Sequence, residues 1–243
     1  MIASLSCAAF GVFMGSILRG FTGFGFGLAA VPLLSLALPP TKVVPLVVVL
    51  QVIVGGVELR AAWKACDWRA VRALFPGLII GIPTGLVILT GIPADPVRLL
   101  IGVIIGLSVL LLWKGVRLPH NPSRAVGVGT GLLSGIISGL SSMGGPPVVV
   151  YLLALGHDAA RVRATSNVYF MLSGLTSIIP MLAGGMIDQD VMIWAAVSIP
   201  ALFGGSWLGT LGFHRARPAH HRHVALIVLS VLSVTLILRA LLI

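Results

Sequence analysis

Hydrophobic positions along this chain form long runs that are separated by short polar or glycine-rich gaps. Ten such runs are nearly free of charge, and each predicts a helical segment inside a membrane. They cover residues 2–18, 24–38, 43–59, 73–91, 97–113, 125–143, 146–155, 164–182, 191–213 and 224–243. An upright crossing takes about 20 residues, so the second and seventh runs are too short to span a bilayer.

Each of the two short runs follows or contains a glycine-rich break. The first break reads GFTGFGFG over residues 20–27, and the second reads SGLSSMGGPP over residues 138–147. The breaks belong to an internal repeat, because a shift of 116 residues pairs Gly11 with Gly127, Gly15 with Gly131, Gly23 with Gly139 and Gln51 with Asn167. Such weak internal symmetry is typical of transporters. It predicts two related halves, residues 1–116 and 117–243, in one integral membrane unit.

The distribution of Lys and Arg indicates how the halves are oriented. If each broken pair is a hairpin that returns to its own side, 12 basic residues share one face and 3 lie on the other. If each broken pair instead makes one crossing, the split is 8 against 7. Basic residues favour the cytoplasmic side, so the first arrangement is preferred. We therefore predict an all-α polytopic membrane protein of two inverted repeats, each a broken or re-entrant helical hairpin plus three transmembrane helices. Both termini are then extracytoplasmic.

Composition excludes several classes of protein. Of 243 residues, 58% are hydrophobic and only 9% are charged, whereas soluble domains are about a quarter charged. A soluble enzyme or a nucleic-acid-binding module is therefore excluded, and the net charge of +10 reflects membrane topology rather than an acidic polymer partner. The first run has no basic start or clear cleavage site, so we interpret it as a membrane segment and not a signal peptide.

The two breaks carry the chemistry that the sequence suggests. Backbone groups freed from a helix inside a membrane must face protein or a water-filled cavity, and helix N-termini attract anions. Glycines there let a ligand approach the backbone. The candidate substrate-binding residues lie in the breaks or on the apolar helices beside them: Arg19, Thr22, Gly23, Phe24, Gly25, Phe26, Gly27, Gln51, Ser141, Ser142, Met143, Gly144, Gly145, Thr165, Ser166, Asn167 and Tyr169.

Several of these residues have a simpler alternative reading. Arg19 is either a counter-charge for an anion or a snorkelling side chain at the end of a hairpin. Gln51 and Asn167 either contact substrate or bridge neighbouring helices. The remaining glycine series, such as Gly77/Gly81/Gly85 and Gly127/Gly131/Gly135, are better explained by close helix packing.

Other chemistry is weakly represented. The six carboxylates fall near the ends of apolar runs, so the sequence predicts no acidic site at mid-membrane and offers no obvious carrier for a coupling proton or sodium ion. His220, His221 and His223 are interpreted as a solvated basic loop rather than a metal site. We expect no catalytic residues, no metal and no cofactor.

At the two breaks the chain resembles the sulfite exporter TauE/SafE family, also called the toluene sulfonate uptake permease family. The motifs are the glycine series that ends at Pro32, its counterpart that ends at Pro146-Pro147, and the sequence RATSN at residues 163–167. The resemblance implies transport of small anions across the bacterial inner membrane: sulfite, sulfonates, sulfoacetate-like compounds or small organic acids. Phenylalanines alternate with the first glycines here, where many relatives have a glycine run, which implies a narrower cavity.

We therefore expect a secondary carrier in which a small anion binds between the breaks and the two halves rock against each other. The expected partners are the anion and the lipid bilayer, and the sequence leaves the coupling ion and the oligomeric state open. A passive anion channel is one alternative. A membrane-embedded enzyme or an assembly partner without a transport role is the other.

Overall fold

The part of the chain that the structure describes is entirely helical. This computed structural model describes residues 2–22, 25–114 and 122–215. Within them lie nine helices: α1 (Ile2–Thr22), α2 (Phe26–Ser35), α3 (Pro40–Ala65), α4 (Trp68–Gly91), α5 (Ala94–Lys114), α6 (Arg124–Ser141), α7 (Gly145–Ala154), α8 (Ala159–Ala183) and α9 (Gln189–Arg215). The predicted tenth run, the histidine-rich loop before it, and Gly23 and Phe24 fall outside the described residues.

Helix lengths divide the fold into long and short elements. Five helices are long and apolar enough to cross a membrane: α3, α4, α5 over Ala94–Leu111, α8, and α9 over Gln189–Leu211. By contrast, α2 and α7 have ten residues each. Ten residues rise about 15 Å, half of a hydrocarbon core of about 30 Å. The prediction that these two segments are too short for an upright crossing is confirmed.

Several helices begin at polar caps outside the apolar runs. The Asp67 carboxylate accepts hydrogen bonds from the backbone N–H groups of Arg69 and Ala70 and so starts α4. Ser123 caps α6 and Asp158 caps α8 in the same way. At the other end, α3 continues to Ala65, although its apolar run stops at residue 59. The hydrophobic pattern therefore marks the membrane core of each helix but not its full length.

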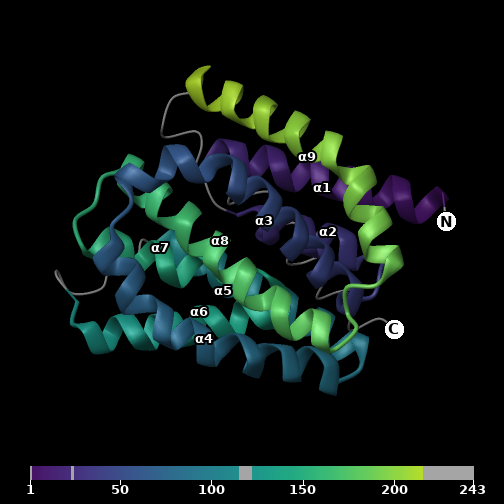
Figure 1. Cartoon of the computed structure of the whole chain (residues 1–243), viewed down its shortest axis with the longest axis horizontal. Coiled ribbons are helices and arrows are strands. Elements are labelled where there is room, and N and C mark those ends of the chain that lie inside the picture. Colours follow the sequence, from purple (N-terminus) through teal and green to yellow (C-terminus); the bar gives the residue numbers. More distant parts are fainter. Residues whose placement is uncertain (1, 23–24, 115–121, 216–243) are drawn as a thin grey trace.

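The helices pack in three pairs that organise the molecule. In Figure 1, α1 and α9 lie along the upper edge, α4 and α6 along the lower edge, and α3 and α8 between them. Glycines allow the two outer pairs to approach closely. A Cβ added to Gly77, Gly81 or Gly85 of α4 would overlap the backbone of α6, and one on Gly20 would overlap the backbone of α9. The predicted close packing at the α4 and α6 glycines is confirmed.

Residue contacts also give the direction of each pair. Gly77 meets Gly131 and Gly85 meets Gly139, so α4 and α6 run parallel. Conversely, Gly55 of α3 meets Met171 of α8 while Val52 meets Gly174, so α3 and α8 run antiparallel.

Both broken helix pairs are hairpins. In the first, Gly11 of α1 contacts Leu34 of α2, and Gly15 contacts Ala30, so the two helices run antiparallel. In the second, Gly127 of α6 contacts Tyr151 of α7. Nearer the break, the Ser134 hydroxyl of α6 donates to the Gly144 carbonyl over 2.7 Å. Each hairpin therefore enters and leaves at one end of the molecule, with its tip in the interior.

Candidate functional site

The tips of the two hairpins meet. Gly25, just before α2, has a φ of 95°, a left-handed conformation that favours glycine. Ser142, just after α6, has a φ of 55°, which is uncommon for a residue with a side chain. A Cβ on Gly27 would overlap the Ser142 carbonyl oxygen. The first turn of α2 therefore lies directly against the second break, and the two predicted breaks form one region.

A buried charged cluster lies next to this region. Arg19 lies about one helical turn before the end of α1 at Thr22, and its side chain is only 4% exposed. The Arg19 Nη2 lies 2.8 Å from Oε2 of Glu58 on α3, and the Asn167 Nδ2 on α8 donates to the same oxygen over 2.8 Å. Three helices thus converge on one carboxylate. The snorkelling alternative for Arg19 is wrong, because the side chain is buried and paired inside the protein.

Glu58 is the acidic partner that the sequence did not connect with Arg19. It lies near the end of an apolar run and about two helical turns before the end of α3 at Ala65. Its side chain remains 31% exposed, which leaves room beside the ion pair. An unmatched arginine in an apolar segment was the available signal, because buried intramembrane charges pair with one another.

The cluster has unused hydrogen-bonding capacity. Among the described residues, the Arg19 Nε, the Asn167 Oδ1 and the Ser166 Oγ are buried and have no hydrogen-bond partner. A buried polar atom without a partner costs about 1–3 kcal/mol, so such atoms are uncommon unless a water or ligand satisfies them. Two donors and an acceptor are thus available beside the hairpin tips.

The second break is held by its own hydrogen bonds. Tyr169 of α8 donates from its hydroxyl to the Ser134 Oγ over 3.0 Å, and Ser134 donates to the Gly144 carbonyl. The Ser141 hydroxyl donates to the Ile137 carbonyl within α6. Met143 is buried. These groups fix the shape of the break, and their polar atoms are already engaged.

Two further predicted side chains act between helices. The Gln51 amide of α3 donates to the Phe170 carbonyl of α8 over 3.1 Å, as the helix-bridging alternative expects. The Thr165 hydroxyl accepts the Asp67 backbone N–H over 2.9 Å. Among the predicted residues, Arg19, Ser166 and Asn167 therefore supply unpaired polar atoms. The polar groups of Gln51, Thr165 and Tyr169 bond to neighbouring segments, and that of Ser141 bonds within α6. Phe26 is buried among other apolar side chains.

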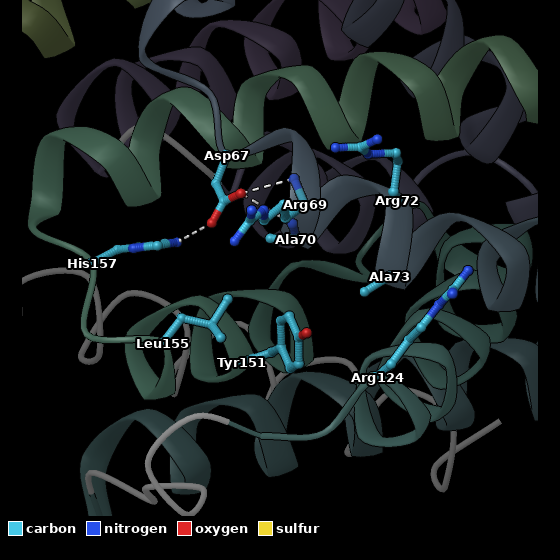
Figure 2. Close-up of a pocket in the computed structure, with 9 residues that line it drawn as sticks. All are labelled: Asp67, Arg69, Ala70, Arg72, Ala73, Arg124, Tyr151, Leu155 and His157. Carbon is cyan, nitrogen blue, oxygen red and sulfur yellow. Dashed lines mark hydrogen bonds and ion pairs between the residues drawn. The ribbon is translucent and has the colours of Figure 1, made fainter.

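A separate cavity of about 540 Å³ opens at the end of the molecule where α4 and α6 begin. It was not anticipated from the sequence. Figure 2 shows Asp67 and His157 on one side of it and Arg72 and Arg124 on the other. The complete lining is Asp67, Arg69, Ala70, Arg72, Ala73, Arg124, Tyr151, Leu155 and His157.

Asp67 is firmly held in its charged form at this cavity. Its carboxylate lies 2.7 Å from the His157 Nε2. Burial alone would raise the Asp67 pKa, but the backbone N–H groups of Ala70 and Arg69 and the nearby His157 together lower it below the usual aspartate value. At the adjoining Cys66, burial raises the thiol pKa to about 11, so this thiol stays protonated at neutral pH.

Long apolar helices, two short hairpin helices and an interior charged cluster define a multi-pass helical membrane protein. Residues 7–236 match the sulfite exporter TauE/SafE family, and the chain belongs to this family. The resemblance noted from the sequence is thereby confirmed. Membership makes the chain a transport protein rather than an enzyme.

Two relatives are similar to this chain along much of their length. The probable sulfite/organosulfonate exporter TauE of Cupriavidus necator is 26% identical over 234 residues, covering 93% of this chain and 91% of the relative. The probable inner membrane transporter protein TsaS of Comamonas testosteroni is 28% identical over 190 residues, covering 74% and 76%. No solved structure matches at a significant level.

Proposed function

We propose that this chain is a secondary transporter that moves a small anion of the sulfite or organosulfonate class across the bacterial inner membrane. The names of the two relatives support this substrate class and this membrane. The observation that carries the proposal is the buried Arg19–Glu58–Asn167 cluster, with unpaired polar atoms, beside the point where the hairpin tips meet.

Alternating access follows from two inverted repeats, residues 1–116 and 117–243. Inverted repeats place equivalent helices antiparallel, and α3 and α8, the first full-length helices after each hairpin, are antiparallel. The packing is also reciprocal, because α1 pairs with α9 of the other half and α6 pairs with α4. In this arrangement the arginine-rich end, which holds Arg69 and Arg124, is cytoplasmic, and both termini are extracytoplasmic.

The anion site is built mainly from the first break. The first N–H groups of a helix lack intrahelical partners, so the start of α2 offers donors at Phe26, Gly27 and Leu28. The start of α7 is poorer in donors, because Gly145 is followed by Pro146 and Pro147, which have no N–H. The anion therefore sits between the start of α2 and Arg19, with Asn167 alongside, and the second break forms the opposite wall.

Glu58 competes with the anion for Arg19. In the structure the Glu58 carboxylate pairs with the Arg19 guanidinium, so an arriving anion must displace Glu58 from the same group. This competition keeps the binding of the anion weak enough for its release.

The proposal is tested by counterflow of radiolabelled sulfite in proteoliposomes that contain only this purified chain. We expect saturable uptake, and we expect Arg19→Gln and Asn167→Leu to lower it at least about tenfold, since a hydrogen bond to a charged group contributes about 1.5–3 kcal/mol. The control is Gly129→Ala, because no atom lies within 4 Å of a Cβ at that position. Flux unchanged in both variants would overturn the proposed site. Conductance without counterflow would indicate a channel, and no flux from the pure chain would indicate an assembly partner.

A further inference from the structure

The cavity at the start of α4 and α6 is strongly unbalanced in charge. Its wall carries three arginines, Arg69, Arg72 and Arg124, but only one carboxylate, Asp67. The Asp67 carboxylate already accepts hydrogen bonds from two backbone N–H groups and lies within hydrogen-bond distance of His157. None of the three arginine side chains forms an ion pair within the described ranges, and their one side-chain hydrogen bond there runs from Arg72 Nε to the Trp68 carbonyl. The wall is therefore an uncompensated cationic surface.

The fold forces these charges together. The Gly77/Gly81/Gly85 face of α4 and the Gly131/Gly135/Gly139 face of α6 hold the two helices parallel and in close contact. Their N-terminal ends consequently lie side by side, with Arg69 and Arg72 in the first turns of α4 and Arg124 at the first residue of α6. Two parallel positive helix ends add to the arginine charges. A negative charge placed between the three arginines would be stabilised by both helix ends and by the arginine side chains.

The cavity is also connected to the central cluster through α8. Thr165 accepts the backbone N–H of Asp67, which lines the cavity, and two residues further along the same helix Asn167 donates to Glu58. The Tyr151 hydroxyl in the cavity wall comes from α7, the short helix of the second hairpin. Figure 2 shows this hydroxyl between the Asp67–His157 side and Arg124. Movement of α8 would therefore change the geometry of both the cavity and the central cluster.

We propose that this cavity is a second anion site, an antechamber that binds a free sulfite or sulfonate group before it enters the central site or after it leaves. The volume of about 540 Å³ leaves room for a small oxyanion with its hydration water. The same chemistry would also suit the phosphate of an anionic lipid headgroup, and the experiment separates the two sources. The transport role of the antechamber rests on the proposed function, whereas its anion binding does not.

The first test is arginine protection in the unmodified protein. The purified chain, in a neutral detergent without lipid, is treated with phenylglyoxal with and without ethanesulfonate, and modified peptides are quantified by mass spectrometry. We expect ethanesulfonate to protect Arg69, Arg72 and Arg124 several-fold and to leave Arg161 unprotected. Arg161 is an exposed basic residue near the same end of the molecule that does not line the cavity. Equal modification of all four arginines with and without the anion would overturn the proposal.

The second test measures ethanesulfonate binding by calorimetry. We expect two sites in the wild type, and one in Asn167→Leu, which damages only the central site. Arg69→Gln/Arg124→Gln should weaken the antechamber site at least about tenfold, whereas Arg161→Gln should leave it unchanged. If the cavity binds ethanesulfonate but the chain transports no sulfite, the proposed function is wrong and the antechamber still stands as an anion site. If Arg69→Gln/Arg124→Gln instead binds ethanesulfonate as the wild type does and loses only its affinity for phosphatidylglycerol in nanodiscs, the cavity is a lipid site and the antechamber is wrong.

Discussion

At the scale of single residues, the Oε2 atom of Glu58 joins three helices. It accepts from Arg19 and Asn167, which precede it by 39 residues and follow it by 109 in the sequence. Such a pairing is invisible to hydrophobic periodicity, which places Glu58 at the end of an apolar run. The lone buried arginine was visible, and its need for a counter-ion was the clue to this acid.

We expect opposite effects from neutralising the two charges of this ion pair. Glu58→Gln preserves shape and an acceptor for Asn167 but frees Arg19, so the dissociation constant for sulfite should fall roughly tenfold. Arg19→Gln should raise it by a similar factor, because an unopposed carboxylate remains. Isothermal titration calorimetry in detergent measures both dissociation constants. Gly129→Ala is the control, and its dissociation constant should equal that of the wild type. Changes of the same sign in both variants would contradict competition between Glu58 and the anion.

Asp67 gives a prediction for stability against pH. Its pKa is lowered in the folded protein, so the stabilisation from its charged form is complete above the ordinary aspartate value of about 3.9 and is lost as the pH falls through the lower folded-state pKa. Asp67→Asn keeps an N-cap but removes the negative charge beside the start of α4 and His157, so it should lower the thermal transition at pH 7 by the equivalent of about 0.3–1 kcal/mol. At pH 3 the difference should shrink. An unchanged transition at pH 7 would show that the charge of Asp67 is dispensable.

At the scale of elements, the glycine breaks were the most informative part of the sequence. They correctly predicted two short helices and the places where the chain turns back. They did not reveal that Pro146 and Pro147 leave α7 with fewer N–H donors than α2, because that matters only once both helices start at a common point. Nor did they reveal the arginine-lined cavity, which depends on the parallel packing of α4 against α6.

We expect this parallel packing to depend on its glycines. A Cβ at Gly81 would overlap the Leu132 carbonyl oxygen, whereas a Cβ at Gly129 on the same pair of helices meets no atom within 4 Å. Gly81→Ala should therefore destabilise the fold by about 1–3 kcal/mol, as overpacking does. Gly129→Ala should be neutral. Thermal unfolding in detergent compares the two, and equal transitions would show that the interface can open without cost.

At the scale of the whole molecule, charge and hydropathy predicted an all-helical membrane protein, and the described helices are consistent with it. Side-chain networks between distant helices were beyond the sequence. One such link is the ion pair between Lys42 at the start of α3 and Asp188 just before α9. This pair lies at the opposite end of the molecule from the arginine-lined cavity. The two ends of the molecule are therefore chemically distinct.

The chemical difference between the two ends predicts which end of the molecule faces the cytoplasm. With cysteines introduced one at a time in a background without Cys7 and Cys66, Lys64→Cys and Arg161→Cys should react with a membrane-impermeant maleimide only from the cytoplasmic side. Asp190→Cys, at the start of α9, should react only from outside. Comparison of intact cells with inverted membrane vesicles measures the sidedness. Labelling of Lys64→Cys and Arg161→Cys from different sides would exclude inverted halves.

The central claim is that a small anion binds where the two hairpin tips meet, and selenite tests it most directly. Selenite has the shape and charge of sulfite, and its selenium atom scatters X-rays anomalously. Crystals of the protein without selenomethionine, soaked in selenite, should show an anomalous peak within hydrogen-bond distance of Arg19 and the first turn of α2. No peak between the two breaks, in crystals of protein that transports selenite, would contradict the account.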